Sequence, residues 1–170
     1  MERTGFKIGN DDIVLLGTEL KVGDKAKDFT LTGLEMQDVK LSDYDDKIKL
    51  IFSVPSFDTP ICQLEIVRFN KEAEKLGDEL VLMAVSADLP FAQSRFCQAK
   101  EISNLVVASD HKEMDFGNKF GTHMKDLRLE NRSVFVLSKD NTVTYVEYVI
   151  QNADHPDYDK ALDAARELLK

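Results

Sequence analysis

Hydrophobic and polar positions alternate along the first third of the chain in short blocks. The apolar runs 6–8 and 13–15 flank the turn-forming segment 9–12, and a weaker pair of runs covers residues 29–31 and 39–41. Such paired runs predict two β-hairpins, the first of them within an N-terminal extension over residues 1–22. Ser42-Asp43 is expected to open a polar turn.

Beyond residue 48 the hydrophobic period alternates between that of strands and that of helices. Residues 49–54 predict a buried strand, and a helix is expected over about residues 60–76 because positions 62, 66, 69, 73 and 76 form one apolar stripe. Continuous apolar runs predict strands at 80–85 and 105–108, with helices over about 90–100 and 112–120, the second closed by Gly121. A hairpin over residues 133–148 and a final helix over 156–169 complete the pattern.

This order of elements predicts an α/β protein with a central mixed sheet flanked by helices on both faces. We expect one domain over residues 1–170, because no linker, repeat or low-complexity block interrupts the chain. Periodicity alone supports the α/β class and nothing finer.

Composition narrows the classes of function. The net charge of −9 argues against a nucleic-acid partner and against binding to an anionic membrane surface. No apolar run approaches the ~20 residues that a membrane helix needs, and no apolar segment of a secretory signal follows Met1. A cytoplasmic protein without a membrane is therefore expected.

Two cysteines, Cys62 and Cys97, are too few for a disulfide scaffold and too far apart for a Cys-x-x-Cys motif. Cys62 falls in the first turn of a predicted helix, just after a strand. Unpaired N–H groups and a partial positive charge at a helix start favour ionisation of a thiol to the reactive thiolate. The spacing Pro55-x-x-x-Thr59-x-x-Cys62 is typical of a peroxide-reducing cysteine site.

Each of these residues also has a simpler interpretation. An isolated cysteine in a helix is usually a small buried hydrophobic residue, and Thr59 alone would be a helix cap. Pro55 alone would end a strand, and Arg132 alone would be a solvated charge or a member of an ion pair. The spacing as a whole favours the catalytic interpretation.

A second segment makes that interpretation specific. Together with the Cys62 motif, residues 86–97, which read SADLPFAQSRFC, resemble the thiol peroxidase subfamily of the peroxiredoxins. The similarity extends from about residue 23 to residue 170 and includes Arg132 with the apolar residues after it. Pro60 and Ile61 stand where small residues are common, and Asn131 stands where alanine or an apolar residue is usual. The resemblance implies a thioredoxin-like fold with an N-terminal β-hairpin extension.

The resemblance also implies a role for each site residue. Cys62 would attack a hydroperoxide and become a sulfenic acid. Arg132, with backbone N–H groups near Cys62, would stabilise the leaving oxygen, Thr59 would contact sulfur and peroxide, and Pro55 would shield the site from water. Cys97 would resolve the sulfenic acid by forming an intrachain Cys62–Cys97 disulfide. Hydrogen peroxide and alkyl hydroperoxides would be the substrates, and the apolar residues 57, 61 and 91 favour the alkyl class.

The family further implies thioredoxin as the reductant and a homodimer, with no metal or organic cofactor. Because a disulfide needs Cα atoms within about 7 Å, the helices that carry the two cysteines are expected to unwind in part on oxidation. Glu65 lies one turn past Cys62, and we expect it to point away because an acid would oppose thiolate formation.

Two other functions use the same residues. A general disulfide oxidoreductase would need a Cys-x-x-Cys motif, which the sequence lacks. A peroxide-sensing switch protein could signal through the same disulfide and differs from an enzyme by its lack of turnover. The three scattered histidines have no zinc-ligand spacing, and no nucleotide- or flavin-binding motif is present.

Overall fold

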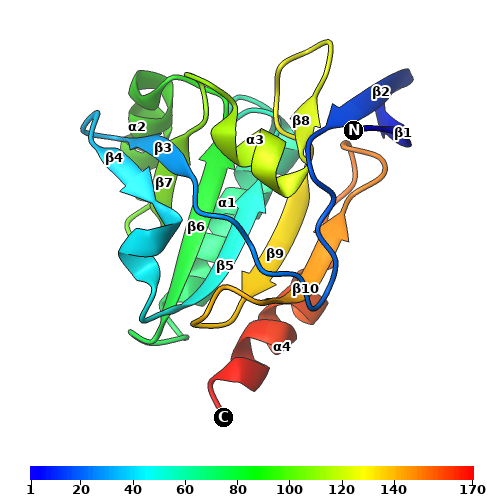
Figure 1. Ribbon diagram of the computed structural model, residues 1–170. Helices are drawn as coiled ribbons and strands as arrows, with labels where there is room; N and C mark the ends of the chain where they lie inside the picture. The colour runs from blue at the N-terminus through cyan, green and yellow to red at the C-terminus, as the bar shows by residue number, and fades with distance from the viewer.

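The computed structural model describes residues 1–170 and centres on a seven-stranded mixed sheet with the strand order β10-β9-β5-β6-β7-β3-β4 (Figure 1). Strands β5, β6 and β7 run parallel to one another, and the strands on either side of them join antiparallel. The strands are β3 (Thr30–Gly33), β4 (Asp38–Lys40), β5 (Ile48–Ser53), β6 (Leu80–Ser86), β7 (Val106–Ser109), β9 (Ser133–Leu137) and β10 (Val143–Tyr148).

Helices cover both faces of this sheet, as the sequence predicts. Helices α1 (Pro60–Ala73), α2 (Pro90–Ala99) and α4 (Tyr158–Leu168) share one hydrophobic core with the sheet, and α3 (Asp115–Phe120) belongs to a second core on the opposite face. Figure 1 shows α3 in front of the sheet and α1 behind it. Successive side chains of a strand point to opposite faces, so Leu50 and Phe52 enter the first core and Ile51 enters the second.

The N-terminal hairpin is confirmed and belongs to a separate, three-stranded sheet. Strands β1 (Glu2–Ile8) and β2 (Asp11–Leu16) pair antiparallel, and the short strand β8 (His123–Met124) pairs with β2. The sequence does not predict β8, because a strand of two residues is too short to give a periodic signal. The second predicted hairpin is confirmed as β3 and β4, at the edge of the main sheet.

Element boundaries differ from the predictions at three helices, and α4 begins at Tyr158, two residues after its predicted start. Helix α3 begins at Asp115 and not near residue 112, because Met114 has a left-handed backbone with φ of 53° that an α-helix cannot contain. Gly121, with φ of 75°, ends α3 as predicted. Helix α1 ends at Ala73, three residues before the predicted limit, and the predicted polar turn at Ser42 is the 3-10 helix η1 (Leu41–Tyr44). None of the helices has the combined length and hydrophobicity that crossing a bilayer requires.

Candidate active site

Cys62 is the third residue of α1, directly after the connection that leaves β5. Thr59 has an extended backbone at the N-cap position, and Pro60 occupies the first helical position, where its missing N–H leaves no hydrogen bond unmade. The Cys62 side chain is 0 % exposed and belongs to the core shared by α1, α2 and α4. The helical stripe therefore correctly predicts that the sulfur faces the protein interior.

Arg132 meets Cys62 because of the strand order. Strands β5 and β9 are neighbours, and Ser53 at the end of β5 pairs with Ser133 at the start of β9. The residue just before β9 therefore lies beside the chain that leads into α1. Nη2 of Arg132 donates a hydrogen bond to Sγ of Cys62 at 3.3 Å, and this contact strengthens when the sulfur is a thiolate.

Glu65 also faces this site, so the prediction that it points away is wrong. Its side chain is 0 % exposed, and its Oε1 accepts a hydrogen bond from Nη1 of Arg132 at 2.8 Å. The reason lies in the helix, where residues three apart share a face, so Glu65 is buried on the same side as Cys62. Arg132 supplies the cation that makes a buried carboxylate tolerable there.

Of the two groups in this ion pair, only Glu65 is expected to change its protonation near neutral pH. Burial raises the pKa of Glu65 to about 7, although Arg132 acts in the opposite direction. For Arg132, burial disfavours the charge, but attraction to Glu65 and Cys62 outweighs burial and raises the pKa of the guanidinium. Arg132 therefore remains a cation, and Glu65 is the member of the pair that gains or loses a proton.

Thr59 and Pro55 lie on the connection between β5 and α1. Pro55 is buried, and Thr59 is partly buried. The Thr59 hydroxyl donates to the carbonyl of Ser56 at 3.2 Å and makes no capping bond to the helix. The simpler interpretation of Thr59 as a side-chain helix cap is therefore wrong.

Cys97 lies in the last turn of α2 and is only 7 % exposed. Burial raises the pKa of its thiol to about 11, so this cysteine stays protonated at neutral pH while α2 is intact. Both cysteines are free thiols and belong to the same hydrophobic core.

The comparisons with known proteins agree with this geometry. The Redoxin family model matches residues 21–162. The thiol peroxidase of Bacillus subtilis (strain 168) is 46% identical over 170 residues, and the alignment covers 100% of both chains. The thiol peroxidase of Listeria innocua is 43% identical over 166 residues, and the alignment covers 98% of this chain and 99% of the relative. The chain belongs to the thiol peroxidase family.

Solved structures support the same assignment. A crystal structure of a peroxiredoxin-like protein from Aquifex aeolicus has a TM-score of 0.90 at 34% identity, covering 98% of this chain and 97% of that one. A thiol peroxidase from Chromobacterium violaceum has a TM-score of 0.84 at 20% identity over 95% of both chains, which supports the fold alone. The predicted peroxiredoxin family and its thioredoxin-like fold are confirmed.

In this thiol peroxidase, a carboxylate joins the element of Cys62 to that of Cys97. The Asp88 carboxylate accepts hydrogen bonds from the Ser56 hydroxyl at 2.9 Å and from the Phe57 N–H at 2.8 Å, both on the connection before α1. It also accepts from the Ser86 hydroxyl at 2.7 Å, which in turn accepts from Nε2 of Gln93 in α2 at 2.9 Å. These bonds hold the Cys62 connection and α2 together in the reduced protein.

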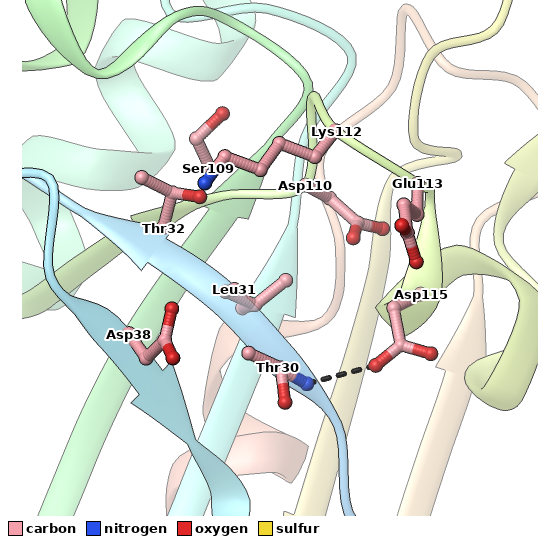
Figure 2. A pocket seen from close by; sticks show the side chains of 9 residues that line it. All are labelled: Thr30, Leu31, Thr32, Asp38, Ser109, Asp110, Lys112, Glu113 and Asp115. Carbon is pink, nitrogen blue, oxygen red and sulfur yellow. Dashed lines mark hydrogen bonds between the residues drawn. The ribbon is translucent and has the colours of Figure 1, made fainter.

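A hollow of about 260 Å³ at β3 and β4 has neither cysteine nor Arg132 in its lining. Figure 2 shows its polar lining, in which Leu31 is the one hydrophobic residue, and the hydrogen bond from the Thr30 N–H to the Asp115 carboxylate at 2.8 Å. The Asp110 carboxylate, also in the lining, accepts from the Gly117 N–H at 2.8 Å. The Asp110 carboxylate thus binds a backbone group at the start of α3, and the Asp115 carboxylate joins α3 to the start of β3, so the hollow belongs to the packing of that helix.

Sequence reasoning placed Glu65 on the wrong side of its helix and missed Asn152. The spacing of three between Cys62 and Glu65 is the signal that could have placed Glu65 on the buried face. Asn152, in the loop between β10 and α4, accepts two hydrogen bonds from the Arg132 side chain through its backbone carbonyl. No sequence signal marks it, because the atom that contacts the Arg132 side chain is a backbone carbonyl. Groups of three His, Cys, Asp or Glu side chains that could hold a metal ion do not occur.

Proposed function

We propose that this thiol peroxidase reduces hydroperoxides through the Cys62 thiolate. The observation that carries the proposal is the hydrogen bond of 3.3 Å from Arg132 to the sulfur, in a buried site at the start of a helix. A fixed cation next to a thiol favours the nucleophilic form of the sulfur and remains in place to stabilise negative charge on a leaving oxygen.

The first step is a displacement at oxygen. The thiolate attacks the terminal oxygen of ROOH, so an S–O bond forms while the O–O bond breaks and its electron pair leaves on the second oxygen. That oxygen takes up a proton and departs as an alcohol or as water, and Cys62 becomes a sulfenic acid. Arg132 and the N–H groups of Ile61 and Cys62 would stabilise the departing oxygen, Thr59 would orient the peroxide, and Pro55 would exclude water.

The second step uses Cys97. Its sulfur attacks the sulfenic sulfur, an S–S bond forms, and the S–O bond breaks with loss of water. Because both cysteines lie within helices and Cys97 is buried, we infer that the first turn of α1 and the last turn of α2 unwind for this step. The raised pKa of Cys97, about 11, supports this order, because the thiol is a poor nucleophile until α2 opens.

Regeneration requires an external dithiol. We propose thioredoxin as this reductant and the cytoplasm as the compartment. Hydrogen peroxide and alkyl hydroperoxides are the proposed substrates. The exposed Phe91, with 67 % of its surface accessible, and the neighbouring exposed Leu89 offer apolar surface near the start of α2 for an alkyl group or for the second subunit of a homodimer.

Turnover tests the proposal. Cumene hydroperoxide, thioredoxin, thioredoxin reductase and NADPH are mixed with the protein, and NADPH loss is followed. We expect continuous NADPH consumption that Cys62→Ser abolishes. The Cys97→Ser variant should consume one equivalent of peroxide and then fail to cycle with thioredoxin.

The outcomes separate the enzyme from a sensor. NADPH consumption by the Cys62→Ser variant would rule out Cys62 as the nucleophile. A wild-type protein that forms the disulfide once and does not cycle would support the peroxide-sensing switch in place of the enzyme. Normal cycling of Cys97→Ser would show that another group resolves the sulfenic acid.

A further inference from the structure

The N-terminal hairpin lies outside residues 21–162 of the family match, yet it is bonded to the loop that contacts Arg132. In β1, the Lys7 N–H donates to the carbonyl of Ile150 at 2.8 Å, and the Asn152 N–H donates to the carbonyl of Lys7 at 2.8 Å. The Gln151 side chain adds two bonds to the backbone of Gly9 at the turn of the hairpin, at 3.0 and 2.9 Å. Segment 150–152 is therefore fixed along the end of β1.

Asn152 uses this anchorage to hold Arg132 at three points. Its backbone carbonyl accepts from Nε and Nη2 of Arg132 at 3.0 and 2.9 Å, and its Oδ1 accepts from the Arg132 backbone N–H at 2.6 Å. Glu65 accepts from Nη1, so Asn152 and Glu65 bind the guanidinium from two sides. The donor that remains directed to Cys62 is on Nη2, at 3.3 Å from the sulfur.

The side-chain amide of Asn152 is held in one orientation. Its Nδ2 donates to the Lys7 carbonyl at 3.0 Å and to Oδ1 of Asn131 at 2.7 Å, so both donors and the acceptor are used. Asn131 donates in turn to the Arg132 carbonyl at 2.9 Å, and it stands where the family resemblance leads one to expect alanine or an apolar residue. Asn152 is only 2 % exposed, so each of these bonds lies away from solvent.

We propose that Asn152 is a positioning residue for Arg132 and that the N-terminal hairpin, through the Lys7 carbonyl, holds Asn152 in place. The inference rests on the proposed function, in which Arg132 acts on the peroxide at Cys62. Arginine has many rotamers, and a displacement of about 1 Å at a catalytic group can cost about a hundredfold in rate. The three bonds from Asn152 remove that freedom, and the hairpin supplies the rigid support.

Two reactions of Cys62 distinguish positioning from general stability. Oxidation by hydrogen peroxide requires Arg132 at the leaving oxygen, whereas alkylation by iodoacetamide depends on Arg132 only through the fraction of thiolate, which the start of α1 also favours. Both rate constants are measured in the Cys97→Ser background, where Cys62 is the sole thiol. Asn152→Ala keeps the backbone carbonyl that binds the guanidinium but removes the amide bonds that hold this carbonyl in place. We expect it to lower the peroxide rate constant between about tenfold and a hundredfold and to change the alkylation rate constant by less than about threefold.

The matched control is Asn104→Ala. Asn104 bonds to Asn70 and Glu74 at the C-terminal end of α1, about two helical turns or more beyond Cys62, so its removal should leave both rate constants within about twofold. Gln151→Ala tests the hairpin without touching Asn152, and we expect the peroxide rate constant to fall about threefold or more while alkylation is unchanged. It also serves as the test if Asn152→Ala does not fold.

The results for three variants are decisive. An unchanged peroxide rate constant in Asn152→Ala, or an equal fall of both rate constants, would overturn the positioning role of Asn152. An unchanged peroxide rate constant in Gln151→Ala would overturn the contribution of the hairpin. Arg132→Lys in the same background separates the two hypotheses. Full peroxide reactivity there would refute the role of the Arg132 guanidinium, whereas no oxidation of Cys62 by peroxide in the Cys97→Ser parent would refute the proposed function itself.

Discussion

Replacing Glu65 by glutamine tests the buried ion pair beside Cys62. Glutamine has nearly the same shape and keeps Oε1 as an acceptor for Arg132, but it cannot ionise. In the wild-type protein the Glu65 and Arg132 side chains are 0 % and 2 % exposed, and Oε2 of Glu65 has no hydrogen-bond partner. The substitution therefore removes the titration of one carboxyl group with little change in packing.

The expected effect follows from the pKa of Glu65, which burial raises from 4.5 to about 7 in the folded protein. Because folding raises this pKa, the stability that the carboxyl contributes is fully present below pH 4.5 and is lost as the pH rises through about 7. With about 1.4 kcal/mol for each pKa unit, the loss between about pH 5.5 and about pH 8 is on the order of 2 kcal/mol. The difference in unfolding free energy, wild type minus Glu65→Gln, should fall by that amount over the same range.

Urea unfolding under reducing conditions measures this difference. Far-UV circular dichroism is the suitable signal because the chain has no tryptophan, and the chosen pH range stays above the sequence pI of 4.8. The same pair of variants in a Cys62→Ser background removes any contribution from ionisation of that thiol. Cys97, with a pKa of about 11, titrates above the range and is present in both proteins. A difference that does not change with pH would refute the assignment of the titrating group to Glu65.

Three further predictions concern other parts of the molecule. Arg132→Lys keeps the positive charge, but a lysine cannot bond Glu65, Asn152 and the sulfur of Cys62 at the same time. The rate constant for oxidation by peroxide, measured by stopped flow, should therefore fall about a hundredfold. A loss below about threefold would contradict the role of the guanidinium. Asp88→Ala removes hydrogen bonds of the reduced protein that the proposed unwinding would break, and bonds to a charged acceptor contribute about 1.5–3 kcal/mol. Because this destabilises the reduced form, a dithiothreitol redox titration should give a disulfide potential about 30–60 mV more negative. An unchanged potential would exclude this role of Asp88. Burial and the neighbouring Asp110 raise the pKa of Glu130, so the stability that its protonated form contributes is lost as the pH rises. Glu130→Gln should therefore raise the melting temperature at pH 8 more than at pH 6, and an equal effect at both pH values would contradict the raised pKa of Glu130.

The sequence predicted what depends on local pattern and strand order. The 3.6-residue stripe of α1 was sufficient to turn Cys62 inward, and the buried-strand patterns were sufficient for β5 and β6. The start of α3 could not be predicted, because it depends on the left-handed backbone of Met114, a conformation that methionine rarely adopts. Strand β8 depends on β2, more than a hundred residues away in the chain.

In the site, too, the residues set by local sequence could be predicted and those set by distant contacts could not. The spacing of Pro55, Thr59 and Cys62 is local and could be read directly. Burial of Glu65 is decided by a cation 67 residues further along the chain, and the contribution of Asn152 is made largely by a backbone carbonyl. A hydropathy pattern assigns an isolated acid to the surface, so it cannot anticipate a partner supplied by another strand.

The error over Glu65 leads to a more specific view of the site. A carboxylate beside a thiol would oppose ionisation of the sulfur only if both groups were anionic at once, with Arg132 as the single cation between them. A pKa near 7 removes that conflict, because Glu65 can hold a proton when the sulfur carries the negative charge. In its protonated form Glu65 still accepts the hydrogen bond that orients the guanidinium. The acid therefore positions Arg132 in either protonation state, and it competes with Cys62 for the cation only when it is ionised.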